Sequence, residues 1–180
     1  MTGELRAVLF DSGGVLIRPI GGRWNPRADF EETVLGYDPT VTPERFAGAI
    51  AAGEAFFATS ETTPDYDDYH RFLLRHLGLQ PTPALLADLS REVPATSVLE
   101  VFPDVVETLE GLRRRGVRMA VVSDAWPGLP AAHAELGLGG YFEAYAIELG
   151  HVGRALCRDG AVEPPGVASI TALTEIIDLF

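Results

Sequence analysis

The sequence predicts an α/β fold built on a parallel sheet, with a helical segment inserted after the first strand. Short apolar runs at 5–10 and 117–122 each stop at a polar residue, which is typical of buried parallel strands. The long segment 19–100 has helical spacing and turn residues but little strand signal. We therefore expect a core formed by residues 1–18 and 101–180 around an inserted helical block at 19–100.

The core elements follow from apolar runs and turn residues. Ser12-Gly13-Gly14 interrupt the first strand after Asp11, because two glycines allow a tight turn. The arginines at 113–115 lie where a helix would end, so we expect them to be solvated and to favour its dipole. The later core elements are expected to be a helix from Pro103 to Gly116, the strand 117–122, a helix at 128–137, a strand at 141–147 and a closing amphipathic helix marked by Ile170, Leu173, Ile177 and Phe180.

The inserted block contains repeated helix-start signals. A Thr followed by Pro suits the N-cap and first helical positions. This pair occurs at Thr42-Pro43, at Thr63-Pro64 and at Thr82-Pro83. We expect helices at 28–35, from Thr42 to Ala58, from Thr63 to about Leu77, and from Thr82 through Leu89. The block is therefore predicted to be a small helical bundle.

Composition excludes several classes of function. The chain of 180 residues has 14 Arg, no Lys and 26 acidic residues, for a net charge of −12. That balance argues against nucleic-acid binding and against a basic membrane-surface protein. The absence of Lys excludes a Schiff-base or P-loop lysine, and the single Cys157 excludes an internal disulfide or a multi-cysteine zinc site. With no signal peptide or long apolar run, we expect a cytoplasmic protein outside the membrane.

Two polar positions at predicted strand ends are candidates for chemistry. Asp11 follows the first strand directly, and Ser123-Asp124 end the second. Ligands of open α/β sheets bind beyond the carboxyl ends of the strands. An Asp there can attack a phosphoryl or alkyl centre, and glycine-rich backbone N–H groups can hold an anion. Simple turn caps at Asp11 and at Ser123-Asp124 are the alternative.

These residues resemble motifs of the haloacid dehalogenase-like hydrolases. Ala7-Val-Leu-Phe-Asp11-Ser-Gly-Gly-Val-Leu-Ile17 is similar to the family's first motif. Phe102-Pro103-Asp104 and Val121-Val-Ser123-Asp124 resemble the approach to the second motif and the motif itself. The helical block 19–100 resembles the family's cap. The resemblance implies a Rossmann-like core with a helical cap.

The resemblance also implies roles for individual residues. Asp11 would be the nucleophile, Ser123 would hydrogen-bond the transferring group, and backbone groups of Ser12 and Gly13 would form the anion cradle. Mg²⁺ would be bound by Asp11 and the backbone carbonyl of Gly13. Phosphatases of the family carry a second Asp at the position of Gly13, where dehalogenase-type members lack it. Its absence weakens protonation of the leaving group, a step typically worth roughly 10²–10⁴-fold.

Two further motifs of the family have no clear match. The third motif is normally a Lys, and only Arg154 or Arg158 is available as a substitute. The fourth motif is an acidic pair that holds Mg²⁺, and neither Asp159 nor Asp178 follows an apolar strand. We interpret the join near 147–150 as the position of a missing block that would carry both motifs and their strand. Its loss would expose an edge beside the first strand and weaken binding of the cation.

Three functional hypotheses remain. The first is a hydrolase with an aspartyl intermediate that acts, with impaired activity, on a small phosphorylated metabolite. The second is a catalytically inactive binding protein or truncated remnant, and the third is a dehalogenase. Asp124, Trp24 and Trp126 are candidate substrate contacts, with packing as the alternative for both tryptophans. The four histidines are dispersed, so ordinary surface or half-buried roles are expected for them. The sequence leaves the oligomeric state unknown.

Overall fold

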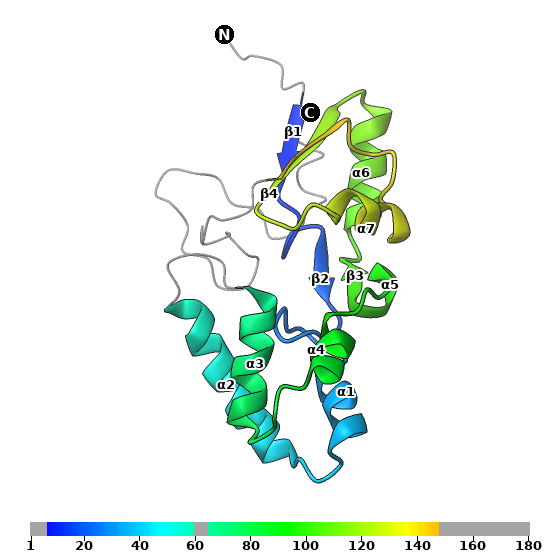
Figure 1. Ribbon diagram of the computed structural model, residues 1–180. Helices are drawn as coiled ribbons and strands as arrows, with labels where there is room; N and C mark the ends of the chain where they lie inside the picture. Colours follow the sequence, from blue (N-terminus) through cyan, green and yellow to red (C-terminus); the bar gives the residue numbers. More distant parts are fainter. Residues whose placement is uncertain (1–6, 60–64, 148–180) are drawn as a thin grey trace. The chain divides into compact units, whose positions relative to one another are not determined.

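The computed structural model describes residues 7–59 and 65–147 (Figure 1). They divide into two compact units, one from the described residues up to Arg18 and from Leu99 onward, the other Pro19–Val98. In chain order the elements are β1 (Ala7–Phe10), β2 (Ile17–Pro19), α1 (Phe30–Tyr37), α2 (Pro43–Ala58), α3 (Tyr66–His76), α4 (Pro83–Ser90), α5 (Ala95–Val98), β3 (Leu99–Val101), α6 (Val105–Arg114), β4 (Arg118–Ser123), α7 (Leu129–Glu135) and β5 (Ala144–Ile147).

A parallel three-stranded sheet in the order β1-β4-β5 forms the centre of the first unit. Phe10 of β1 pairs with Val121 of β4, and Ser123 of β4 pairs with Ile147 of β5. The carboxyl ends of all three strands therefore lie at the same end of the sheet. The structure confirms the α/β class and the parallel sheet predicted from the sequence.

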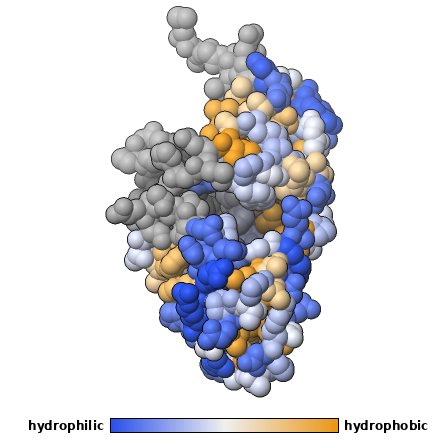
Figure 2. All heavy atoms as spheres, in the orientation of Figure 1, coloured by the Kyte–Doolittle hydropathy of each residue, from blue (hydrophilic) through white to orange (hydrophobic). Residues whose placement is uncertain are grey.

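Helices α6 and α7 cover one face of this sheet (Figure 1). Residues facing them, such as Phe10 and Val121, are buried. On the opposite face, Leu9 is 69% exposed and Val122 is 48% exposed, and hydrophobic surface is visible in this unit (Figure 2). Parallel sheets usually have both faces covered, whereas Leu9 and Val122 on this face are exposed in the part of the chain that the structure describes. Among the described residues, β1 pairs in this sheet with β4 alone.

Strands β2 and β3 form a short two-stranded sheet. This sheet was not predicted, because the segment 19–100 has little strand signal. The Ile20 amide donates to the Val98 carbonyl at 2.9 Å, and the Phe102 amide donates to the Leu16 carbonyl at 3.1 Å. Residue numbers rise along one strand as they fall along the other, so the pair is antiparallel. Strands of three residues carry almost no local pattern, and their pairing arises from contacts distant in the sequence.

The second unit is the helical bundle expected from the sequence. Thr42 and Thr82 are N-caps, because their side chains accept hydrogen bonds from the amides of Arg45 and Leu85. The predicted start at Thr63 is wrong. Helix α3 begins at Tyr66, and the Asp65 carboxylate caps it by accepting from two amides in the first turn. An Asp N-cap satisfies these donors and also favours the helix dipole.

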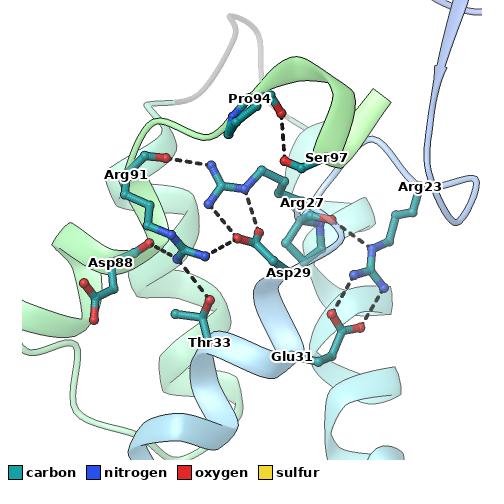
Figure 3. A network of polar contacts seen from close by, with 10 residues as sticks. Arg23, Arg27, Asp29, Glu31, Thr33, Asp88, Arg91, Pro94 and Ser97 are labelled. Carbon is teal, nitrogen blue, oxygen red and sulfur yellow. Dashed lines mark hydrogen bonds and ion pairs between the residues drawn. The ribbon is translucent and has the colours of Figure 1, made fainter. Parts of the chain in front are cut away.

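Apolar side chains of α1 to α4 form the interior of the bundle, and an ionic network lies beside it. The buried cluster includes Phe30, Val34, Phe46, Tyr69, Leu73, Leu74, Leu77 and Leu85. Asp29 is held by Arg27, with Nε–Oδ1 and Nη2–Oδ2 distances of 2.6 and 2.9 Å, and by Arg91 Nη2 at 2.7 Å (Figure 3). The network joins the segment before α1 to the residue after α4.

Several predicted ends shift by a few residues. The strand expected at 141–147 begins at Ala144, where pairing with Ala120 of β4 starts. Before it, the Tyr141 hydroxyl donates to Glu110 of α6 at 2.7 Å. The helix expected at 128–137 is α7, Leu129–Glu135. The closing helix expected at 170–180 lies outside the described residues. None of the helices in the described ranges combines the length and the apolar character needed to cross a bilayer.

Candidate active site

Asp11 and Ser123 lie at the same end of the parallel sheet. Asp11 directly follows Phe10, the last residue of β1, and is half-buried. Ser123 is the last residue of β4 and is 8% exposed. Because Phe10 pairs with Val121, the register places Asp11 level with Val122, one residue before Ser123. The two principal residues of the predicted site are therefore on neighbouring strands at their carboxyl ends.

The turn after Asp11 is held by its own backbone. The Ser12 amide donates to Asp11 Oδ1 at 2.7 Å. The Ser12 carbonyl accepts from the amides of Val15, Leu16 and Ile17 at 3.2, 2.8 and 3.1 Å, and the Gly14 amide donates to the Ile17 carbonyl at 2.8 Å. Gly14 has φ +76°, a conformation that glycine adopts without strain.

This turn restricts how an anion could bind. The amides of Ser12 and Gly14 are occupied within the turn, whereas the Gly13 amide makes no hydrogen bond to a described residue. The other Asp11 oxygen, Oδ2, is likewise without a hydrogen bond to the part of the chain described. The expected cradle therefore offers the Gly13 amide, beside a carboxylate oriented by the Ser12 amide.

A buried hydrogen-bond chain lies behind the turn. The Ser12 hydroxyl and His133 Nε2 are 2.8 Å apart, and both residues have 0% exposure. His133 Nδ1 is 3.2 Å from the Tyr145 hydroxyl on β5. Burial lowers the pKa of His133 to about 4, which keeps the imidazole uncharged at neutral pH.

The remaining predicted contacts are exposed. Asp124 is exposed directly after Ser123, and Trp126 is 42% exposed. A Cβ on Gly128 would lie 2.9 Å from Trp126 Nε1, so this ring lies against the backbone where α7 begins. Trp24 belongs to the second unit and is 44% exposed. Its neighbour Arg23 makes a bidentate ion pair with Glu31, at 2.9 Å for both bonds (Figure 3).

The described residues do not make up a metal site. No group of three or more His, Cys, Asp or Glu within 7–59 and 65–147 is arranged to hold a metal ion. Near the turn, the donors are the Asp11 carboxylate and the Gly13 carbonyl, fewer than the donors Mg²⁺ usually takes from protein and substrate. The substitutes considered for the third motif, Arg154 and Arg158, and the join proposed near 147–150 fall outside the described residues, apart from 147.

His133 was not singled out from the sequence, where the histidines were expected to have ordinary surface or half-buried roles. The structure instead buries it fully against Ser12. Leu129 and Ala132 are buried on the same helix, so His133 lies four residues after one apolar position and next to another. Helical spacing thus contained a signal for its burial, but its contact with residue 12 is set by the tertiary fold.

Comparison with known proteins now identifies the family. A family model described as haloacid dehalogenase-like hydrolase matches residues 5–161. The chain belongs to this family of hydrolases, whose members generally use Mg²⁺. No curated protein matches the sequence.

Solved structures share the fold. A protein assigned as a β-phosphoglucomutase from Thermotoga maritima is 16% identical, with a TM-score of 0.53 over 79% of this chain and 61% of that one. An L-2-haloacid dehalogenase is 20% identical, with a TM-score of 0.50 over 81% of this chain and 64% of that one. At such identities the likeness concerns the fold alone. The match spans less than two thirds of each of these two proteins' length.

Proposed function

We propose that this chain is a hydrolase that uses Asp11 as a nucleophile on a small phosphorylated metabolite, with activity below that of a complete site. The observation that carries the proposal is the oriented carboxylate of Asp11 at the carboxyl end of β1. One oxygen is held by the Ser12 amide at 2.7 Å, which leaves the other to attack. The adjacent Gly13 amide and the Ser123 hydroxyl are the candidate donors to the phosphoryl oxygens.

The reaction has two steps. Asp11 Oδ2 forms a bond to phosphorus while the bond from phosphorus to the leaving oxygen breaks, giving an aspartyl phosphate. Water then attacks this intermediate, which releases phosphate and restores the carboxylate. The leaving oxygen takes a proton from solvent or departs as an anion, because Gly13 provides no acidic side chain.

Two features favour a low rate. General acid catalysis contributes roughly 10²–10⁴-fold in enzymes that have it, and the turn of this chain lacks a residue for it. The described residues also provide few donors for Mg²⁺, so the repulsion between Asp11 and an anionic substrate is poorly offset. The alternative function is a binding protein or remnant without turnover.

A dehalogenase is the second candidate activity. Glycine at position 13 is compatible with it, because displacement of a halide by a carboxylate needs no protonated leaving group. The carboxylate would then form an ester with the carbon that loses the halide, and water would hydrolyse it. No feature of the described residues marks a halide site.

The test measures turnover of p-nitrophenyl phosphate and of 2-chloropropionate, with and without Mg²⁺, by the chain and by Asp11→Asn. Asn keeps the shape of the side chain but removes the nucleophilic charge. We expect release of p-nitrophenolate that falls to background in Asp11→Asn. Asp68→Asn is the matched control, since it makes the same change at an exposed carboxylate on α3, outside the candidate site. Equal background in the wild-type chain and Asp11→Asn on both substrates would overturn the enzyme proposal.

A further inference from the structure

The buried hydrogen bonds that link the side chains of Ser12, His133 and Tyr145 connect three segments of the first unit. Ser12 belongs to the turn after β1, His133 to α7 and Tyr145 to β5. Both ring nitrogens of His133 are engaged, at 2.8 Å from the Ser12 hydroxyl and 3.2 Å from the Tyr145 hydroxyl. A polar chain at this depth is directional, whereas an apolar side chain in the same space would pack without orienting its neighbours.

The three hydrogen-bonded side chains do not themselves attack a substrate. Ser12 beside His133 has the composition of a nucleophile and its base, but both residues have 0% exposure. The Ser12 hydroxyl is therefore closed to substrate, and the backbone of the same residue is what contacts Asp11. A role in orientation fits this arrangement.

We propose that His133, supported by Tyr145, is a positioning residue for Asp11 and acts through Ser12. The hydrogen bond to His133 holds the Ser12 side chain, and with it the peptide between Asp11 and Ser12. The N–H of that peptide holds Asp11 Oδ1 at 2.7 Å. The orientation of Oδ2 toward substrate thus depends on a ring in α7. The inference rests on the proposed function of Asp11 as nucleophile.

The neutral ring suits this role in either tautomer. Hydroxyls donate or accept, so Ser12 can donate to Nε2 while Nδ1 donates to Tyr145, or both bonds can run the other way. Burial lowers the pKa of His133 to about 4, so one neutral form or the other persists over the usual range of assay pH. The support for Asp11 therefore requires no change of charge.

The experiment compares His133→Leu with His133→Gln. Both are similar in size, but the Gln amide places a polar atom near the position of Nε2. We expect kcat for p-nitrophenyl phosphate to fall roughly 10- to 100-fold in His133→Leu, because small displacements of a reacting group have effects of this size. The KM should change by less than about threefold, and His133→Gln should recover most of kcat. A purely structural role predicts equal kcat for the folded fraction of both variants.

Three further variants complete the test. Ser12→Ala should lower kcat as His133→Leu does, and the double variant should be no slower than either, since one connection is lost in each case. Tyr145→Phe removes a single hydroxyl and should lower kcat by a smaller factor, about twofold to fivefold. Thr108→Val is the control, because Thr108 is equally buried and its hydroxyl donates to the carbonyl of Asp104, the residue before α6.

Amide hydrogen exchange tests the same inference without turnover. The Ser12 and Leu16 amides should exchange at least tenfold faster in His133→Leu, while the Val121 amide in β4 stays protected. Unchanged exchange in the turn, or equal kcat in His133→Leu and the wild-type chain, would overturn the positioning role. If the wild-type chain has no Asp11-dependent turnover, the proposed function fails, and exchange alone decides whether His133 orders the turn.

Discussion

Helix α2 contains two glycines for which the same substitution should have opposite effects. A Cβ at Gly53 would lie 2.8 Å from Leu73 Cδ2 and 2.8 Å from the Tyr69 hydroxyl oxygen. Both neighbours belong to α3 and are almost fully buried, at 0% and 1% exposure. A Cβ at Gly48 would meet nothing within 4 Å. Gly53 thus lies directly against side chains of α3, whereas Gly48 faces open space.

The magnitudes follow from two competing terms. Replacing Gly by Ala inside a helix gains about 1 kcal/mol of helix propensity. Overpacking a buried contact costs about 1–3 kcal/mol. Gly48→Ala should therefore stabilise the bundle by up to about 1 kcal/mol, since it has no packing cost. Gly53→Ala should change stability by between about 0 and −2 kcal/mol, so the two variants differ by about 1–3 kcal/mol.

Urea unfolding followed by far-ultraviolet circular dichroism measures both free energies. The two variants carry the same chemical change in one helix, so their difference isolates the contact with α3. The reasoning would be refuted if Gly53→Ala were as stable as Gly48→Ala. That result would mean that α2 and α3 move apart at no cost, contrary to the burial of Tyr69 and Leu73.

Two other predictions concern the ionic network and the leaving group. Burial alone raises the pKa of Asp29, but the hydrogen bond and charge of Arg27, with the charge of Arg91, outweigh it and hold that pKa below 3.8. Asp29→Asn should therefore lower the free energy of unfolding by about 1 kcal/mol at neutral pH. The difference in stability between the variant and the wild-type chain should vanish as the pH falls through the lowered pKa of Asp29. Urea unfolding at each pH measures it, with the exposed Glu92→Gln as control. Gly13→Asp should raise turnover of an alkyl phosphate by roughly 10²-fold or more, because the new carboxyl group can protonate the leaving oxygen. Turnover of p-nitrophenyl phosphate should rise little, since its leaving group departs unprotonated. Equal gains on both substrates would contradict the absence of a general acid in the wild-type chain.

Much of the fold was predictable because local signals agreed with the tertiary structure. The apolar runs before Asp11 and before Ser123 correctly predicted β1 and β4, whose ends form the candidate site. The pairs at Thr42 and Thr82 gave two helix starts correctly, since capping is a local hydrogen-bond problem. The failure at Thr63 has a local cause too, because Asp65 is a competing N-cap two residues later.

The candidate site was predictable only in part. Asp11 and Ser123 stand out as polar residues directly after strands, and the register confirms that they lie at one end of the sheet. The contact between His133 and Ser12 joins residues that are 121 positions apart, so the sequence around either residue does not predict it. The β2–β3 pair was missed for the same reason.

That pair determines how the inserted segment is connected to the core. The chain leaves the core along β2 and returns along β3, so the two ends of Pro19–Val98 are hydrogen-bonded neighbours. Once the bundle has folded, the core has a connection equivalent to a tight hairpin, although the loop is long in sequence. The entropic cost of closing a loop grows only slowly with its length. A folded insertion whose two ends are already adjacent lowers that cost. Any compact unit with ends about 5 Å apart could replace the bundle without changing the path of the core strands.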